Sequence, residues 1–232
     1  MTCMIDFHAH VLPGVDDGSR NVEESIAMLS EMNSQGVKTV VATPHFYAND
    51  ERVDEFIRRR NAAREALAKE WDNLPKILLG AEVRYYPGIS RLEGLSLLKV
   101  EGSRLLLLEM PFSRWTEYIV KELEDLAGCG NITVVLAHIE RYIAMQKKET
   151  LQRLLRSGVL FQCNSSFFVQ RIGRRKAIRM MRNGEIHFLG SDCHNMEDRA
   201  PNLNMAVELL KKRFGDSFTS DFVGFGNELF LC

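Results

Sequence analysis

The chain has 232 residues, of which 45% are hydrophobic and 26% are charged, and its formal net charge is −1. This length predicts one α/β domain over residues 1–232, with a core that needs no disulfide or structural zinc. The balance of 30 basic and 31 acidic residues excludes a broad basic surface for nucleic acid or anionic lipid. No apolar run is long enough to span a membrane, the N-terminus does not resemble a signal peptide, and the five cysteines lack paired spacing. We therefore expect a cytoplasmic protein with free thiols.

Short apolar runs alternate along the chain with amphipathic runs of helical period. A strand is predicted at residues 4–7, followed by a helix that starts at Asn21, with Glu24 at the capping-box spacing, and stops at Gly36. Strands at 37–43, 76–82 and 104–109 follow, with a charged helix over about 51–71 between the first two. The remaining elements are a helix at 116–127, a strand at 132–138, a helix at 146–156, a strand at 159–164, a helix at 176–183, a strand at 186–192 and a helix at 202–214.

Seven apolar strands separated by helices indicate a parallel sheet that is covered on both faces. The chain has no linker, repeat or low-complexity break, which favours a closed or nearly closed βα barrel. In such a barrel the active site lies at the C-terminal ends of the strands. An open doubly wound sheet is the alternative, but the chain has neither G-x-G-x-x-G nor G-x-x-x-x-G-K-[ST] to support a nucleotide-binding version.

Histidines and acidic residues gather at the ends of these predicted strands. Five of the six histidines lie there, and with nearby acids they make a set of candidate metal ligands: His8, His10, Asp17, His45, Glu82, Glu109, His138, Asp192 and His194. Asp6, His8 and His10 share one face because side chains alternate along a strand. The sixth histidine, His187, points away from Asp192 by the same alternation, so we expect it to have a packing or surface role.

Imidazole nitrogens and carboxylate oxygens together bind Mn, Fe or Zn. So many buried carboxylates would repel one another without cations. The candidates outnumber the four to six ligands of one ion, so the sequence predicts two or three ions that share a bridging carboxylate. Paired ions clamp a phosphoryl group and make hydroxide at neutral pH. The alternatives are a polar barrel mouth held by hydrogen bonds alone and a catalytically dead metal-binding scaffold.

The motifs D-F-H-A-H, T-P-H, A-H-I-E-R-Y and G-S-D-C-H-N, with the Glu82 strand, resemble those of the polymerase and histidinol phosphatase (PHP) superfamily of metal-dependent phosphoesterases. The resemblance covers almost the whole chain. Within the superfamily, the segments V-D-D-G, G-A-E, H-I-E-R-Y, N-S-S and S-D-C-H-N look like those of the bacterial manganese-dependent protein-tyrosine phosphatases of capsular and exopolysaccharide operons.

This resemblance implies a distorted (β/α)7 barrel of the PHP type that holds two or three Mn²⁺ ions, with Fe or Zn as alternatives. The implied sites are one ion on His8, His10, Asp192 and Glu82, a second on Glu82, Glu109 and His138, and a third on His45, His194 and an acid. We prefer Asp17 as that acid. The alternative, Asp16, could instead cap the turn at this point, because an Asp close to a glycine is a strong turn former. Two phosphate-binding arginines are implied as well and map to Arg141 and Arg199. Their guanidinium forks match phosphate oxygens, the alternative being solvated surface arginines.

The implied activity is hydrolysis of a phosphate monoester, above all phosphotyrosine in the tyrosine-rich tail of a capsular or exopolysaccharide tyrosine kinase. A hydroxide that bridges two ions would attack phosphorus in line with the leaving oxygen, while Arg141 and Arg199 orient the phosphate. A small-molecule phosphatase of the histidinol-phosphate type is the second hypothesis. A nuclease lacks support because no basic stripe accompanies the site, and we expect neither nucleic-acid partners nor membrane insertion. The oligomeric state stays open.

Cys193 and Arg199 have the C-x5-R spacing of cysteine-dependent tyrosine phosphatases. That mechanism needs a loop of free backbone N–H groups and a thiol of low pKa. Here the loop carries Glu197 and Asp198, which would repel phosphate, and it contains no glycine. We therefore predict that Cys193 is not a nucleophile.

Overall fold

The computed structural model describes residues 4–68, 74–170 and 173–228. The strands are β1 (Met4–Ala9), β2 (Val37–Ala42), β3 (His45–Phe46), β4 (Lys76–Leu79), β5 (Glu82–Arg84), β6 (Leu105–Glu109), β7 (Thr133–Leu136), β8 (Leu160–Asn164) and β9 (Phe188–Gly190). The α-helices are α1 (Val22–Ser34), α2 (Val53–Leu67), α3 (Glu117–Gly128), α4 (Lys148–Arg156), α5 (Ser165–Val169), α6 (Arg174–Arg182) and α7 (Leu203–Glu228). Short 3₁₀ turns are η2 (Ile89–Arg91), η3 (Leu95–Leu98) and η4 (Ile139–Arg141).

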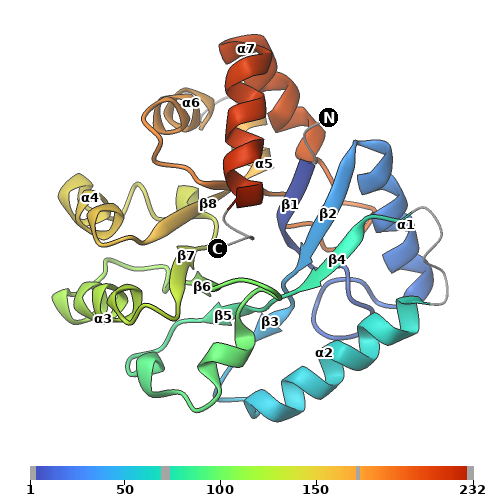
Figure 1. Cartoon of the computed structure of the whole chain (residues 1–232), viewed down its shortest axis with the longest axis horizontal. Helices are drawn as coiled ribbons and strands as arrows, with labels where there is room; N and C mark the ends of the chain where they lie inside the picture. The colour runs from blue at the N-terminus through green and yellow to red at the C-terminus, as the bar shows by residue number, and fades with distance from the viewer. Residues whose placement is uncertain (1–3, 69–73, 171–172, 229–232) are drawn as a thin grey trace.

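The strands form a curled parallel sheet, and the helices lie around its outside (Figure 1). Hydrogen bonds join them in two runs, β1-β2-β4 and β3-β5-β6-β7-β8-β9, and every pair within these runs is parallel. Strands of a parallel sheet are joined by crossovers, which here carry the helices. The predicted mixed α/β fold with a parallel sheet is therefore confirmed.

The sheet is buried on both faces, as the apolar strands predicted. Alternate residues of β6 belong to different core clusters, Leu106 to the larger and Leu107 to the smaller. The larger cluster includes Leu29 of α1, so it lies between the sheet and the helices. The smaller cluster contains Phe7 and Phe188, whose rings stack with centroids 4.0 Å apart. This second cluster fills the inside of the curl below the strand ends.

One predicted strand is followed by a short strand that was not predicted, and another is interrupted. The strand predicted over 37–43 is β2, which ends one residue earlier, and the two-residue strand β3 begins at His45 after Pro44, which has no N–H to donate to a ladder. Instead of one strand over 76–82, β4 ends before Gly80 and β5 begins at Glu82. The carbonyl of Pro44 accepts a hydrogen bond from Glu82 N at 3.0 Å. These breaks leave His45 directly beside Glu82 in the β3–β5 pair.

The first strand and the segment after the last strand meet along their length. Ala9 and Cys193 form a parallel bridge, Asp192 N donates to His8 O at 2.8 Å, and His10 N donates to Cys193 O at 2.9 Å. Gly190 makes this approach sterically possible, because a Cβ on it would lie 2.5 Å from the Cβ of His8. The first strand and the segment around residues 191–193 therefore lie side by side in the curled sheet.

The predicted helices are present, with differences at their ends. Asn21 caps α1 by accepting from Glu24 N at 2.9 Å, whereas the Glu24 carboxylate turns to Arg20 N at 2.8 Å, so the predicted capping box is only half formed. The predicted end of the second helix at Trp71 lies outside the described residues. The helix predicted over 202–214 is the first part of α7 and breaks at Gly215, where φ is 88° and ψ is 171°; the helical segment beyond this kink was not predicted. The short helix α5 was not predicted.

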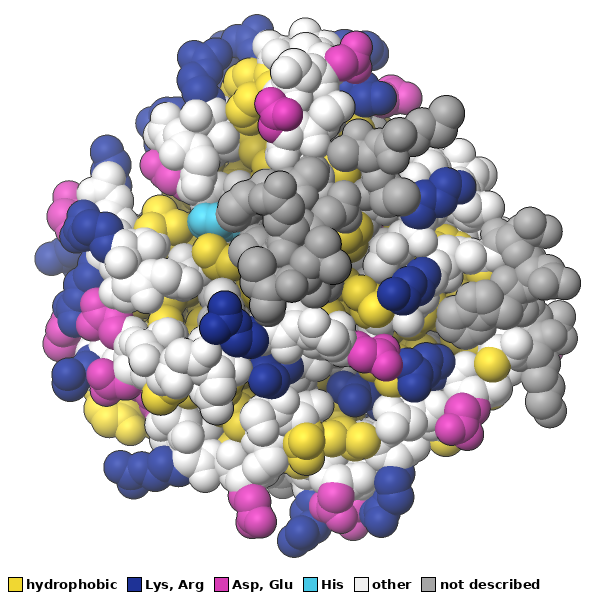
Figure 2. All heavy atoms as spheres, viewed as in Figure 1, with side chains coloured by type: hydrophobic (Ala, Val, Ile, Leu, Met, Phe, Trp, Pro, Cys, Tyr) yellow, Lys and Arg dark blue, Asp and Glu magenta, His cyan; other side chains and the backbone are white. Residues whose placement is uncertain are grey.

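Charges are mixed on the surface. Figure 2 shows basic and acidic side chains interspersed around one face of the molecule, with apolar patches between them. No helix among the described residues combines the length and the apolar character that crossing a membrane requires.

Candidate metal centre

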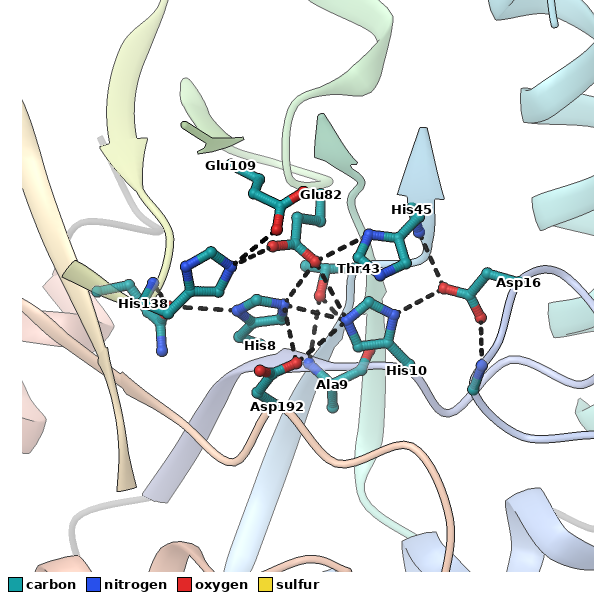
Figure 3. Close-up of polar contacts among 12 residues, drawn as sticks. His8, Ala9, His10, Asp16, Thr43, His45, Glu82, Glu109, His138 and Asp192 are labelled. Atoms are coloured by element: carbon teal, nitrogen blue, oxygen red, sulfur yellow. Dashed lines mark hydrogen bonds and ion pairs between the residues drawn. The ribbon is translucent and has the colours of Figure 1, made fainter. Parts of the chain in front are cut away.

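The predicted ligands converge at the C-terminal ends of the strands. His8 belongs to β1 and His10 follows it, His45 is in β3, Glu82 in β5 and Glu109 ends β6. The others lie in loops that follow strand ends or border the same opening: Asp17, His138, Asp192 and His194. Figure 3 shows most of these side chains pointing toward one another from their separate strands. The structure thus brings together residues from both halves of the chain.

Glu82 is at the centre of the cluster and contacts four imidazoles. Its Oε2 lies 3.1 Å from His8 Nε2, 3.3 Å from His10 Nε2 and 3.1 Å from His45 Nδ1, and its Oε1 lies 2.8 Å from His138 Nε2. The carboxylate is only 1% exposed. Burial opposes its ionisation, but the surrounding imidazoles outweigh burial and hold its pKa well below the ordinary value. A carboxylate with both oxygens so placed is suited to bridge cations.

Three subsets of the cluster have ligand atoms within 4.8 Å of one another. They are His10, Asp17, His45 and His194; His8, His10 and Glu82; and His45, Glu82 and Glu109. Ligand atoms bound at about 2.1 Å to a single ion lie within a little over 4 Å of one another, so these groups have the right scale. The first subset contains the predicted third site, the second contains most of the predicted first site, and the last pairs Glu109 with His45.

His138 and Asp192 lie at the edges of these subsets. His138 Nε2 is 3.6 Å from Glu109 Oε1, close to the position that the predicted second site requires. Asp192 Oδ1 is 3.6 Å from His8 Nε2 and 3.5 Å from His10 Nε2. Both residues have positive φ, 33° at His138 and 54° at Asp192. Such backbone strain in non-glycine residues is concentrated at functional sites.

The hydrogen-bond partners of His8 and His10 indicate that a cation fits here. His8 Nδ1 donates to Gln162 Oε1 at 3.2 Å and His10 Nδ1 donates to Asp16 Oδ2 at 2.6 Å. In a neutral imidazole the other nitrogen then carries a lone pair, yet the two Nε2 atoms lie 3.1 Å apart and both face Glu82. Three acceptors directed at one point need a positive charge between them. Metal ions meet that need, and imidazole with carboxylate is their usual ligand set.

Protonation supplies this charge when no metal does. Burial disfavours the charged form of His10, but hydrogen bonds to Asp16, Asp192 and Glu82 raise its pKa well above the ordinary value. His194 behaves in the opposite way, since burial together with the charges on His10 and Arg199 lowers its pKa to about 4. Its buried Nε2 has no hydrogen-bond partner and lies 3.5 Å from Asp17 Oδ1. A neutral imidazole of this kind is ready to ligate a metal.

The two neighbouring acids Asp16 and Asp17 have different surroundings. Asp16 accepts from the ring of His10 and from the backbone N of His45 at 2.9 Å and of Gly18 at 3.0 Å. Although its burial raises the pKa, these bonds lower the pKa of Asp16 to about 2. The Asp17 side chain is 66% exposed and faces His45 and His194, each at 3.5 Å. Asp16 therefore orients the ring of His10, and the contacts favour Asp17 as the ligand.

Arg141 and Arg199 both lie at the mouth of the cluster and bind Asp192. Arg141 donates to Asp192 Oδ2 at 3.0 Å and Arg199 donates to Asp192 Oδ1 at 2.9 Å. Their side chains remain 39% and 38% exposed. Two guanidinium groups beside a cluster of acids and imidazoles form a surface that suits an anion next to cations.

Two polar residues of β8, Gln162 and Asn164, were not assigned a role from the sequence. Gln162 Oε1 accepts from His138 N at 2.7 Å as well as from His8, and Gln162 Nε2 donates to Asn164 Oδ1 at 3.0 Å. Asn164 Nδ2 in turn donates to Asp192 Oδ2 at 2.8 Å. The sequence signal for this chain of contacts was a glutamine inside an otherwise apolar predicted strand. Gln162 is fully buried, and a buried amide needs hydrogen-bond partners.

His187 and Cys193 lie away from the ligand set, as the alternation predicted. His187 Nδ1 accepts from Phe161 N at 3.0 Å, and burial lowers its pKa to about 4. The Cys193 thiol is fully buried, and burial raises its pKa well above the ordinary value. A thiol in this state is not a nucleophile, so the C-x5-R spacing is coincidental.

Residues 4–228 match the family model described as capsular polysaccharide synthesis, CpsB/CapC. The chain is 34% identical over 230 residues to the tyrosine-protein phosphatase CpsB of Streptococcus pneumoniae, covering 91% of each chain. A crystal structure from work on YwqE of Bacillus subtilis and CpsB of Streptococcus pneumoniae superposes on this chain with a TM-score of 0.84 at 27% identity. The match covers 98% of this chain and 94% of that one, and the two proteins are described as unique metal-dependent tyrosine phosphatases.

A histidinol phosphate phosphatase from Lactococcus lactis, solved with zinc, L-histidinol and phosphate, superposes with a TM-score of 0.58 over 91% of this chain and 94% of that one. Its identity is 14%, so this likeness is one of fold alone. The match to the family model, by contrast, extends over nearly every residue that the structure describes. The chain therefore belongs to the CpsB/CapC family of capsular polysaccharide synthesis.

Proposed function

We propose that this chain is a metal-dependent protein-tyrosine phosphatase that hydrolyses phosphate monoesters at the histidine–carboxylate cluster. The observation that carries the proposal is the convergence of acids and imidazoles around Glu82, with two arginines at its mouth. The similarity to the tyrosine-protein phosphatase CpsB supports the same activity. In this proposal the curled sheet closes as a distorted (β/α)7 barrel in a single domain over residues 1–232, with the active site at the C-terminal strand ends.

The proposed metal ligands are the predicted ones. His8, His10, Asp192 and Glu82 would hold one ion, Glu82, Glu109 and His138 a second, and His45, His194 and Asp17 a third. We propose Mn²⁺ as the native ion because the set contains nitrogen and oxygen donors and no thiolate, and Fe or Zn satisfy the same donors. When bound, the ions supply Lewis-acid activation of water and of the phosphoryl group.

The two arginines would bind and orient the phosphate. Each now donates to a different oxygen of Asp192, so the anchoring groups already point to the centre of the site. A phosphate oxygen offers the same acceptor geometry as a carboxylate oxygen, and a guanidinium fork can transfer from one to the other. Binding by two such forks holds phosphorus in line for attack.

We infer that the substrate is phosphotyrosine in a protein, in particular the tyrosine-rich tail of a tyrosine kinase that controls capsular or exopolysaccharide synthesis. Such a role would place the enzyme in the cytoplasm. The family description, which concerns capsular polysaccharide synthesis, supports this context. A small-molecule phosphatase of the histidinol-phosphate type is less supported, because the likeness to such an enzyme extends to the fold alone.

The test compares turnover of a phosphotyrosine peptide and of histidinol phosphate on one preparation whose metal content is measured. EDTA should abolish hydrolysis of the peptide and Mn²⁺ should restore it, while histidinol phosphate should turn over at least tenfold more slowly. Glu82→Gln should remain inactive after Mn²⁺ addition, and Arg175→Gln, an exposed arginine of α6, should match the wild type. Absence of metal-restored turnover on both substrates would leave a binding scaffold as the better description.

A further inference from the structure

A cavity of about 470 Å³ adjoins the metal cluster on the side of β5 and β6. It is lined by Arg84, Glu109, Met110, Pro111, Phe112, Arg141 and Tyr142. Glu109 and Arg141 belong to the proposed site, and Arg141 lies 3.6 Å from Glu109. The cavity therefore borders the proposed phosphate site, and apolar and aromatic side chains make up most of the rest of its lining.

Phe112 is the most exposed large apolar side chain among the described residues, at 72%. Its loop is nevertheless held in place. The carbonyl of Pro111 accepts from Ser113 N at 2.8 Å and from the indole N–H of Trp115 at 3.3 Å. Gln146 fixes the same loop by accepting from Trp115 N at 3.0 Å and donating to Ser113 O at 2.8 Å. The exposure of Phe112 thus belongs to an ordered loop.

The other walls of the cavity are also fixed. The Tyr142 hydroxyl donates to Met110 O at 2.8 Å and accepts from Met110 N at 3.1 Å, and its ring lies 6.4 Å from the ring of Phe112. The guanidinium carbon of Arg84 lies over the ring of Tyr47, 5.6 Å from its centroid. In the strand register, Arg84 of β5 stands opposite Glu109 of β6. The lining of the cavity therefore combines the exposed ring of Phe112 with other apolar groups and the guanidinium group of Arg84.

We propose that this cavity binds the phenyl ring of phosphotyrosine, with Phe112 as a specificity-determining contact. The inference rests on the proposed function, because it takes the phosphate to lie between the metal cluster and Arg141. An ester bond then places the leaving group within a few ångströms of phosphorus, where Phe112, Met110 and Pro111 offer apolar surface. Aromatic rings pair favourably with a phenylalanine face and with a guanidinium group such as Arg84. A short alkyl phosphate would leave this surface uncovered.

Non-hydrolysable phosphonates test the inference without turnover. We expect the Mn²⁺-loaded protein to bind phenylphosphonate more tightly than methylphosphonate in calorimetry. Phe112→Ala should weaken phenylphosphonate binding by about 5- to 20-fold, since an aromatic contact contributes on the order of a tenfold change in affinity. Its affinity for methylphosphonate should stay within about twofold, because no contact to the phosphonate group is lost. Phe112→Trp should restore the preference for the phenyl compound.

Tyr118→Ala is the matched control, because Tyr118 is an aromatic residue that is 56% exposed on α3 and does not line the cavity. It should bind both phosphonates as the wild type does. Equal loss of both ligands in Phe112→Ala, or no loss of phenylphosphonate, would overturn the inference and leave the proposed function intact. Failure of the wild type to bind either phosphonate would overturn the proposed function and this inference together.

Discussion

Gln162 lies beneath the histidine cluster and contacts two of its members. Its amide oxygen fixes Nδ1 of His8 as a donor, which leaves Nε2 free to face Glu82. It also satisfies the backbone N–H of His138, whose φ of 33° is unfavourable without support. Residues that orient metal-bound imidazoles in this way tune affinity as strongly as many ligands do.

Gln162→Leu should therefore weaken Mn²⁺ binding by about 10- to 100-fold, the range found for such orienting residues. It should also lower the free energy of unfolding by about 1–3 kcal/mol, because the buried N–H of His138 loses its acceptor. Metal titration followed by calorimetry measures the first effect, and urea unfolding measures the second. Gln170→Leu, an exposed glutamine at the end of α5, should change neither quantity. Unchanged metal affinity in Gln162→Leu would show that His8 needs no such support.

His187 gives the stability of the protein a pH dependence. Its pKa is lowered from 6.5 to about 4 by burial, so the unfolded chain takes up the proton first as the pH falls. The stability that the neutral imidazole contributes is present above about pH 6.5 and is lost progressively down to about pH 4. At about 1.4 kcal/mol per unit of pKa, the loss amounts to at most roughly 3.5 kcal/mol.

We expect His187→Gln, whose amide oxygen can still accept from Phe161 N, to unfold with a shallower pH dependence than the wild type between pH 6.5 and 4. Urea unfolding at fixed, saturating Mn²⁺ checks this, because the metal centre contributes equally to both proteins. Parallel curves for the two proteins would contradict the assignment.

The convergence of the nine candidate ligands was predictable because strand ends and side-chain alternation can be read from a sequence. The roles of Gln162 and Asp16 were not, since each depends on a partner brought close by the fold. Gln162 is 154 positions from His8. Asp16 is 29 positions from His45, whose backbone N it binds. The sequence alone does not indicate which of the two adjacent acids, Asp16 or Asp17, lies against the ring of His10.

Among the elements, the junction between β9 and β1 leaves no room for a side chain at Gly190. Gly190 packs so closely that an added Cβ would lie 2.5 Å from His8 Cβ, 2.9 Å from Gln162 Nε2 and 3.0 Å from His8 N. Neither neighbour can move without displacing the histidine cluster. The backbone of β1, and with it the position of His8, is therefore set partly by the absence of a side chain at residue 190.

Gly190→Ala should destabilise the protein by about 1–3 kcal/mol through overpacking and should weaken Mn²⁺ binding, because His8 is pushed out of line. Gly128→Ala is the control, since a Cβ on Gly128 meets nothing within 4 Å at the end of α3. That variant should be neutral or more stable by up to about 1 kcal/mol. Thermal unfolding of both variants and metal titration provide the comparison. A Gly190→Ala protein with wild-type stability would contradict the tight junction.

The predicted elements agreed best with the structure where periodicity is long and apolar. The helix over 116–127 and the strand over 104–109 match α3 and β6 within one residue at each end. The break between β4 and β5 was missed because Gly80 falls inside an otherwise apolar run, and β3 was not predicted because it has only two residues after Pro44. The second half of α7 was missed because Gly215 reads as a helix stop. Local sequence patterns do not show whether a second helical segment follows a break such as the one at Gly215.

At the scale of the whole molecule, the proposed metal centre would couple folding to cation binding. Ligands from β1, β3, β5 and β6 and from the loops after β7 and β9 would share the same ions, so the bound ions would link most of the sheet. A ligand that binds only the folded state stabilises it by about 2.7 kcal/mol at a hundred times its Kd. Without the ions, protons on His8 and His10 would have to balance Glu82, and these protons together with Arg141 and Arg199 would balance Asp192.

We expect EDTA to lower the melting temperature by several degrees and added Mn²⁺ to raise it in a concentration-dependent manner. Differential scanning calorimetry measures both changes. Glu82→Gln, which removes the central carboxylate charge, should show little response to Mn²⁺. A melting temperature that is the same with EDTA and with Mn²⁺ would show that no ion links these elements.

The meeting of β1 with the segment after β9 also determines when the site can exist. Asp6 accepts a hydrogen bond from Ser191 N across 185 positions of sequence. At 5–20 residues per second, a ribosome needs roughly 10–40 s to travel that distance. Throughout that interval the emerging chain carries His8 and His10 without Asp192 or His194. A nascent or prematurely terminated chain therefore cannot assemble the full ligand set, and the centre is completed only by the last strand to be synthesised.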